Sequence, residues 1–231
     1  MDWYNTVVNF FKDGGFFLYP LVIIFVVGVA IAIERWLYLT VETSRNRSLW
    51  EEVAPHLGAG NFKAAIQLAN ASPAQIGTVL KYGLARLSTA RRRDDIQQAM
   101  EESLLEIMPR LEKRTHYLSS LANIGMLVGL LGTILALIHA FGAVSQANPA
   151  EKASLLAAAI SEAMNNTAAG LFVAITLLLS HMFLEAKTTS LIDSLEIAVV
   201  KFLNSITERY SEPAPAPGPA MAPRAPAPRP A

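Results

Sequence analysis

The sequence predicts an all-α integral membrane protein, with three transmembrane helices and long helices that extend into a cytoplasmic domain. Of its 231 residues, 52% are hydrophobic and only 16% are charged, which is unusual for a soluble domain. Three apolar runs are each long enough to cross a bilayer core of roughly 30 Å, which takes about 20 helical residues. A polar segment with helical periodicity lies between the first two runs.

The composition excludes several classes of function. The formal net charge is zero, so no basic surface indicates a nucleic-acid partner. The chain has no cysteine, and its four histidines are too scattered for metal-ligand spacing, so we expect each to be an ordinary surface or interface residue. We therefore expect no enzyme, no catalytic residue, no metal and no cofactor.

The first apolar run predicts a membrane span at 16–40. Residues 16–33 carry no charge, and Glu34, Arg35 and Trp36 follow them, as is typical of a membrane–water boundary. Residues 1–15 contain no basic segment followed by a cleavage site, so we expect the run to remain in the mature protein.

The polar segment at 41–116 predicts helices in water. One of them begins near Asp94 and carries its apolar residues on a single face. That face consists of Ile96, Met100, Leu104, Ile107 and Leu111.

The second apolar run is longer than a membrane requires. No formal charge occurs from 117 to 150, so we expect this helix to project beyond the bilayer.

The tail alternates Pro and Ala, a composition that predicts disorder. The remaining segments are the second span (117–146), a periplasmic loop (147–153), the third span (154–184), a cytoplasmic helix (185–211) and the disordered tail (212–231).

The lysines and arginines predict the orientation. Twelve of the 19 fall at 34–116 and five lie after 185, whereas one precedes the first span and one lies in the loop between the second and third spans. Since cytoplasmic segments carry an excess of these residues, we expect a periplasmic N-terminus and a cytoplasmic C-terminus.

Polar side chains interrupt the second and third spans. If the chain turns near Ala150, antiparallel helices place Thr133 level with Thr167. Small residues at helical spacing let two helix backbones approach closely. These are Gly125, Gly129 and Gly132 on the second span, and Gly170 with neighbouring small residues on the third. Packing alone also explains such glycines, and a membrane threonine often bonds its own helix.

Glu162 is harder to explain by packing. A carboxylate inside a span costs on the order of 2.5–3.5 kcal/mol unless it faces protein or water. Glu162 lies either inside the span or at its outer interface. We expect one small or polar sector to line a protein-walled cavity, which several copies around an axis would enclose. The sector comprises Glu162, Asn165, Asn166, Thr167 and Ala169.

The pair "GLLGTILALIHAF" and "ISEAMNNTAAGLFVAI" resembles the MotA/TolQ/ExbB proton-channel family, and is closest to its three-span TolQ/ExbB branch. The resemblance implies a homo-oligomeric ring, typically a pentamer, in a bacterial inner membrane. It also implies a single-span TolR/ExbD-like partner dimer in the pore, whose aspartate carries protons. Thr133 and Thr167 match the pore-facing threonines, and Glu162 matches the third-helix glutamate. Asn165, Asn166 and Thr176 depart from the best-known members.

We therefore expect a subunit of a motor driven by the proton motive force. Each aspartate of the chain lies outside the apolar runs, so the titrating aspartate must come from the partner. The process driven stays open among TonB-type uptake, Tol–Pal function and motility. A non-conducting scaffold of an export complex is the alternative. An intramembrane protease fits poorly, because no serine lies in a glycine-framed motif.

Overall fold

The computed structural model describes residues 15–87 and 92–210. Every regular element in these residues is an α helix, which confirms the all-α class. Three of the helices are long and apolar enough to cross a membrane. The described helices are α2 (Leu18–Ala59), α3 (Phe62–Ala71), α4 (Gln75–Arg86), α5 (Arg93–Glu112), α6 (Thr115–Gln146) and α7 (Lys152–Tyr210). The predicted tail at 212–231, and residues 1–14 of the predicted N-terminal segment, lie outside the described residues.

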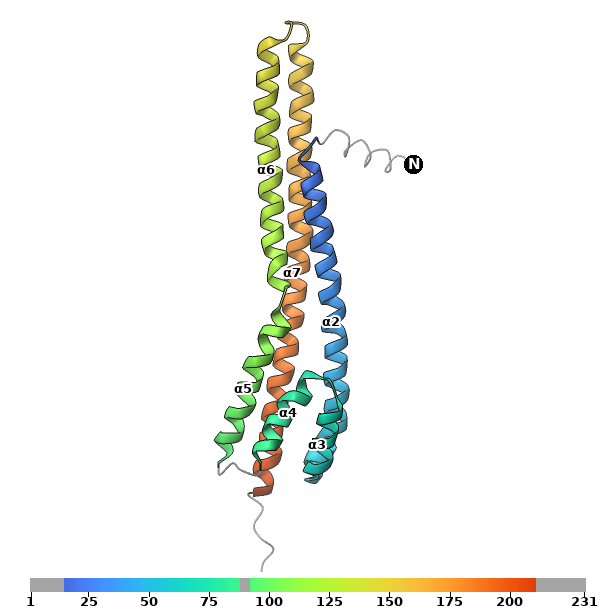
Figure 1. Ribbon diagram of the computed structural model, residues 1–231, viewed down its shortest axis with the longest axis vertical. Helices are drawn as coiled ribbons and strands as arrows, with labels where there is room; N and C mark the ends of the chain where they lie inside the picture. The colour runs from blue at the N-terminus through green and yellow to red at the C-terminus, as the bar shows by residue number, and fades with distance from the viewer. Residues whose placement is uncertain (1–14, 88–91, 211–231) are drawn as a thin grey trace, which may run out of the picture.

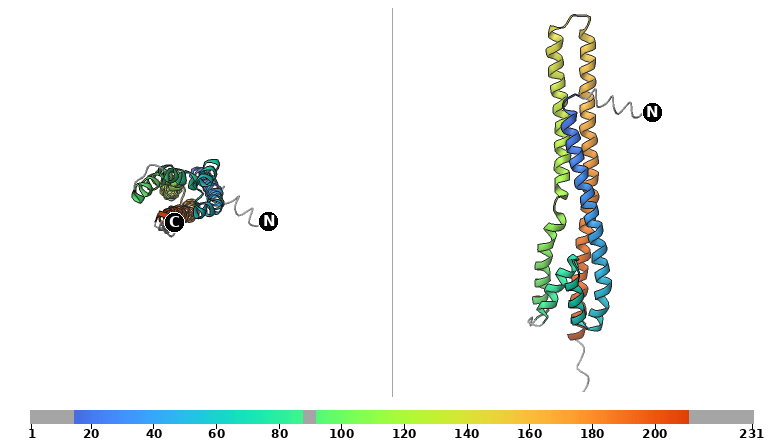
Figure 2. Two further views of the ribbon diagram at one scale, coloured as in Figure 1. Left: turned by 90° about the horizontal axis from the view of Figure 1, so that it is seen from below. Right: turned by 45° about the vertical axis from the view of Figure 1, so that its right-hand side comes forward.

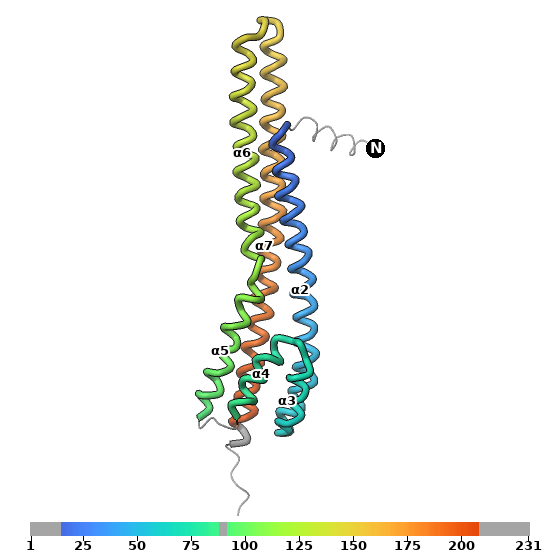
Figure 3. The backbone as a smooth tube through the Cα atoms, viewed as in Figure 1, coloured from blue at the N-terminus to red at the C-terminus, as the bar shows by residue number. Residues whose placement is uncertain are grey.

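The molecule is a long, narrow bundle (Figure 1). Helices α6 and α7 lie antiparallel and side by side, and α2 lies along the same pair (Figure 2). Helix α2 begins some way along α7, so α6, α7 and the loop that joins them project past its start (Figure 3). The shorter helices α3, α4 and α5 gather at the opposite end. We call that end the base. It comprises α3, α4, α5 and the adjoining parts of α2 and α7, from about Leu39 and Leu184 onward.

Helix α7 is continuous over 59 residues. At 1.5 Å per residue it is about 90 Å long, roughly three times the thickness of a bilayer core. The segment predicted as the third span and the helix predicted to follow it therefore form one element, and no joint separates the membrane part from the base.

A hydrophobic core holds the base together. The predicted apolar face of α5 is confirmed, since all five of its residues are buried. Met100 on that face packs in one cluster with Leu80 of α4 and with Phe202 of α7, and all three are fully buried. Burying an apolar side chain of this size stabilises a fold by roughly 1.5–3 kcal/mol. The base therefore fastens α5 and α4 onto the long helix.

Two polar side chains of α2 cap α4. The residue before α4 is Ala74, whose side chain cannot accept the free backbone N–H groups of the first turn. Instead, Glu42 Oε1 accepts from the N–H of Gln75 at 2.9 Å, and Asn46 Oδ1 accepts from the N–H of Ile76 at 3.0 Å. Both side chains are buried. The carboxylate also lies at the positive end of the α4 dipole, which favours its charge.

A sharp break separates α5 from α6. Arg114, at this break, has a φ of 67°, a left-handed conformation that costs a residue with a side chain roughly 1–2 kcal/mol. Two contacts with α2 hold the break in place. Arg114 pairs with Glu34 at 3.1 Å, and the buried Arg35 donates to the carbonyl of Leu111.

Replacing Asn46 by alanine should destabilise the base. The N–H of Ile76 would lose its acceptor in a buried position, which costs about 1–3 kcal/mol. We expect a lower Tm than that of the unaltered chain in detergent, followed by circular dichroism. Ser48→Ala, an exposed change on the same helix, is the control. Equal Tm values for the two variants would contradict the capping role.

Candidate functional site

The closest contact between α6 and α7 is made by backbone. A Cβ atom placed on Gly129 would lie 2.8 Å from the Cα of Gly170 and 2.9 Å from the carbonyl oxygen of Asn166. Real Cβ atoms do not approach other atoms so closely, so only glycine fits at this contact. Gly125 lies against Val173 in the same groove, at 2.9 Å by the same measure. The two helices therefore pack with no side chain between them at this level.

Asn166 lies inside this contact. Its side chain is completely buried and faces Gly132, where an added Cβ would lie 3.1 Å from the Asn166 Cβ and Cγ atoms. Neither its amide nitrogen nor its amide oxygen has a hydrogen-bond partner among the described residues. An unpaired amide in such a position costs about 1–3 kcal/mol.

Thr133 and Thr167 lie on the same side of the α6–α7 pair. Thr133 follows Gly129 by four residues and Thr167 precedes Gly170 by three, which turns each side chain by roughly 40–60° from the line of contact. Because the helices are antiparallel, both rotations lead to the same side. Both threonines are half-buried, and the Thr133 hydroxyl donates to the carbonyl of Leu130 at 2.6 Å.

Helix α2 covers the other side of the pair. Leu18 and Leu21 of α2 pack there against Ala169 of α7 and Val128 of α6. Both of those residues are turned by about 100° away from the line of contact, in the sense opposite to the threonines. Within the described chain, the pair is therefore sealed by α2 on one side and open on the side of the two hydroxyls.

Glu162 lies on the side of α2. Its carboxylate contacts Gly15, just before the first turn of that helix. It also lines a cavity of about 470 Å³ between α6 and α7, next to Ser161 and facing His139. This cavity lies toward the loop that joins α6 and α7, beyond the start of α2.

The expectation that these polar and small residues form a single sector of α7 is wrong, because they face different sides of the helix. The structure divides it, with Glu162 toward α2, Asn166 in the helix contact and Thr167 on the open side. The physical reason is that each residue of an α helix is rotated by about 100° from the one before it. Glu162 and Thr167 are five residues apart, which is a rotation of about 140°.

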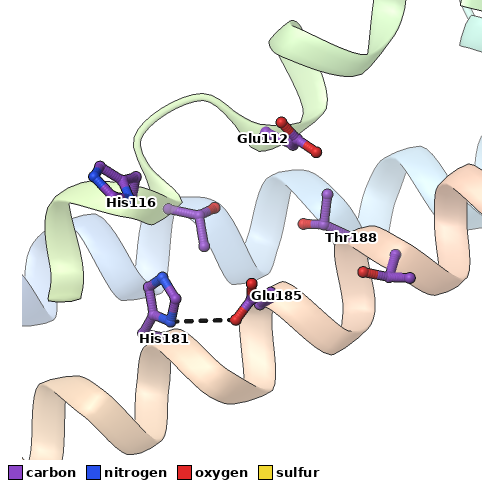
Figure 4. A pocket seen from close by; sticks show the side chains of 7 residues that line it. Glu112, His116, His181, Glu185 and Thr188 are labelled. Carbon is purple, nitrogen blue, oxygen red and sulfur yellow. Dashed lines mark ion pairs between the residues drawn. The ribbon is translucent and has the colours of Figure 1, made fainter.

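A second polar cavity lies at the other end of the α6–α7 pair. His116 and His181, which were expected to be ordinary surface or interface residues, both line it (Figure 4). A turn near Ala150 places Thr133 level with Thr167 on antiparallel helices, and by the same reasoning it places His116 level with His181. Among the described residues, no group of three or more His, Asp or Glu side chains could hold a metal ion.

Substitutions at Gly129 should separate α6 from α7. In Gly129→Val the branched side chain would meet the Gly170 backbone, which cannot move aside as a flexible side chain could. We expect this change to lower the Tm in detergent by several degrees, because overpacking a tight contact costs about 1–3 kcal/mol. Gly142→Val on the same helix is the control, since a Cβ there meets nothing within 4 Å. Equal losses in the two variants would refute the backbone contact.

Comparison with known proteins places this arrangement in a family. The model of the MotA/TolQ/ExbB proton channel family matches residues 71–197, more than half of the chain. A protein of Methanothermobacter thermautotrophicus, named as an ExbB homolog in biopolymer transport, is 26% identical over 203 residues, which are 85% of this chain and 69% of that protein.

Two bacterial relatives match a shorter part. The Tol-Pal system protein TolQ of Haemophilus influenzae is 32% identical over 94 residues, 41% of each chain. The biopolymer transport protein ExbB of Neisseria gonorrhoeae is 34% identical over 97 residues, 42% of this chain and 44% of its own. The matches thus span less than half of these two relatives. With the family match covering α4, α5, α6 and α7 as far as residue 197, the chain belongs to the MotA/TolQ/ExbB proton channel family.

Proposed function

We propose that the chain is a ring-forming subunit of a motor driven by the proton motive force, in which Thr133 and Thr167 face the axis of the ring. The observation that carries this proposal is the asymmetry of the α6–α7 pair. One side is covered by α2, and the other presents the two hydroxyls at one depth. Membership of a proton channel family supports the same reading.

The open side has the chemistry that a helical partner in a membrane requires. Around the two threonines lie apolar side chains turned the same way, and all are exposed in the single chain. They are Met126 and Leu130 of α6, and Ile160, Leu171 and Leu178 of α7. Three helices of one chain cannot enclose a pore, whereas several copies around an axis can. We propose a pentamer around the helices of a TolR/ExbD-like dimer.

The proton carrier in this proposal is a carboxyl group of the partner. No aspartate lies in the described apolar parts of α2, α6 and α7. A threonine hydroxyl can donate to a carboxylate and accept from a carboxylic acid, so Thr133 and Thr167 can stabilise both states of the partner's aspartate. One charge that crosses 100 mV releases about 2.3 kcal/mol, which repeated passage can convert into rotation or tilt of the inner helices.

The base is cytoplasmic in this proposal, and the α6–α7 loop is periplasmic. The excess of Lys and Arg at 34–116 and after 185 supports this orientation in a bacterial inner membrane. Glu162 then lies on the periplasmic side of Thr167, by about 7 Å along α7. Its cavity, shared with His139, then lies toward the periplasm on the α2 side of the pair.

The names of the relatives suggest the work that is done. They include biopolymer transport and Tol-Pal proteins, so we propose that proton flow energises a process of the cell envelope. Which process it is depends on the partner.

Replacing both threonines by alanine should abolish most proton flux. The chain would be co-expressed with its TolR/ExbD-like partner, and flux measured in proteoliposomes under a fixed potential. We expect a loss of about tenfold or more, since the aspartate loses two hydrogen bonds to a charged group at about 1.5–3 kcal/mol each. Serine at both positions should restore flux, because it keeps the hydroxyls.

The control for this experiment is Thr176→Ala. Thr176 is a membrane threonine of α7 that donates to the carbonyl of Phe172 at 2.8 Å and lines a groove beside α2. This change should leave flux unaltered. If the double alanine variant conducts as well as the Thr176 control, the chain acts as a non-conducting scaffold and the proposal fails.

A further inference from the structure

Every residue that lines the cavity beside the α5–α6 break carries a polar side-chain group. It measures about 230 Å³ and lies between the end of α5, the first turn of α6 and the α7 segment opposite (Figure 4). It lies where the charge-free parts of α6 and α7 end and charged residues begin. The lining residues are Glu112, Thr115, His116, His181, Glu185, Thr188 and Thr189.

Two of the residues that line this cavity have buried hydroxyls without a protein partner. Thr115 and Thr188 are 6% and 4% exposed, and neither Oγ1 atom has a hydrogen-bond partner among the described residues. A buried polar group without a partner is costly, and a polar site needs only about 10–15 Å³ to hold a water molecule. The cavity is therefore large enough for several waters.

The titratable groups around this water are two imidazoles and two carboxylates. His181 Nδ1 lies 3.5 Å from Glu185 Oε2 on α7, while Glu112 and His116, which flank the break, line the cavity from the opposite side (Figure 4). Two charged contacts lie nearby, at α2 and the break. These are the Arg114–Glu34 pair and Arg35, which donates to the Leu111 carbonyl. Lys113 is a further charge at the break.

The cavity lies on the base side of the threonine level. His181 follows Thr167 by 14 residues and His116 precedes Thr133 by 17, which correspond to about 21 and 25 Å along the two helices. A proton that has reached the threonines still has to cover this distance before it meets water at the base.

We propose that this cavity is the site where protons leave the conduit for the cytoplasm, with His181 and His116 as the relaying groups. The inference rests on the proposed proton-conducting function. Each imidazole takes up one proton from the conduit side and gives one to the cavity water, so its own charge is restored after every transfer. Histidine suits this role because an imidazole can accept a proton on one ring nitrogen and donate one from the other.

The first test measures whether water reaches the cavity from the base side. The chain has no cysteine, so a single one can be introduced without background. Thr188→Cys should react with a charged, membrane-impermeant methanethiosulfonate in inverted vesicles and not in right-side-out cells. Leu191→Cys, equally buried on the same helix but in the hydrophobic core, should react in neither. If both cysteines are equally protected, the cavity is closed to the cytoplasm and the proposal is overturned whatever the flux.

The second test measures proton flux in the partner complex while the pH on the base side is varied. In the double variant His116→Gln, His181→Gln we expect about a tenfold loss, smaller than the roughly 100-fold effect of a positioned proton acceptor in catalysis, because cavity water still carries part of the current. When the proton motive force is held constant, the remaining dependence of flux on base-side pH near neutrality should also disappear. His56→Gln, near the end of α2 in the base, should change neither quantity.

The outcomes separate the two proposals. If the unaltered complex conducts and the double histidine variant keeps its flux and pH profile, the release site is wrong and the proposed function stands. If the unaltered complex carries no protons at all, the proposed function is wrong and the release site falls with it, even where Thr188→Cys reacts.

Discussion

The contact between the backbones of Gly129 and Gly170 is the constraint on which the membrane part depends. Helices separated by ordinary side chains lie roughly 8–10 Å apart, and here no side chain intervenes. In a membrane, where apolar burial gives little driving force between helices, such close packing is a main source of association. The contact sets the register of α6 against α7, and with it the common depth of Thr133 and Thr167. It also determines which sides of the pair α2 covers and leaves open.

The buried polar groups of the chain fall into two kinds. Glu42 and Asn46 each bond a backbone N–H of α4, so they contribute to folding as a helix cap does. Asn166, Thr115 and Thr188 instead leave buried polar atoms unpaired within the described chain. Apolar residues of similar size would remove that cost. These three residues lie along the α6–α7 pair and its junction with the base, whereas the two capping oxygens hold the base together. Arg35 Nε, Asn46 Nδ2 and Ser103 Oγ are further buried atoms without a partner among the described residues.

Much of the fold follows from apolar pattern alone. Uninterrupted runs indicated three membrane helices, and the 3.6-residue period identified the buried face of α5, because both signals are local. The capping of α4 by Glu42 could not be predicted, since it joins residues 33 apart through tertiary packing. The polar residues of α7 do not share one face, because a rotation of about 100° per residue separates close neighbours in sequence. The juxtaposition of His116 and His181 could have been predicted from the same antiparallel register as that of the threonines, extended to the ends of the two apolar helices.

The unbroken length of α7 has a mechanical consequence. About 65 Å of continuous helix separate Thr167 from the last residue of α7, and helices of this kind bend only gently. A tilt of about 5° just beyond the threonine level would displace the far end by about 6 Å, since α7 contains no glycine or proline after Gly170. The helix can thus act as a rigid lever, which turns a displacement of about an ångström near the threonine hydroxyls into a larger one at the base.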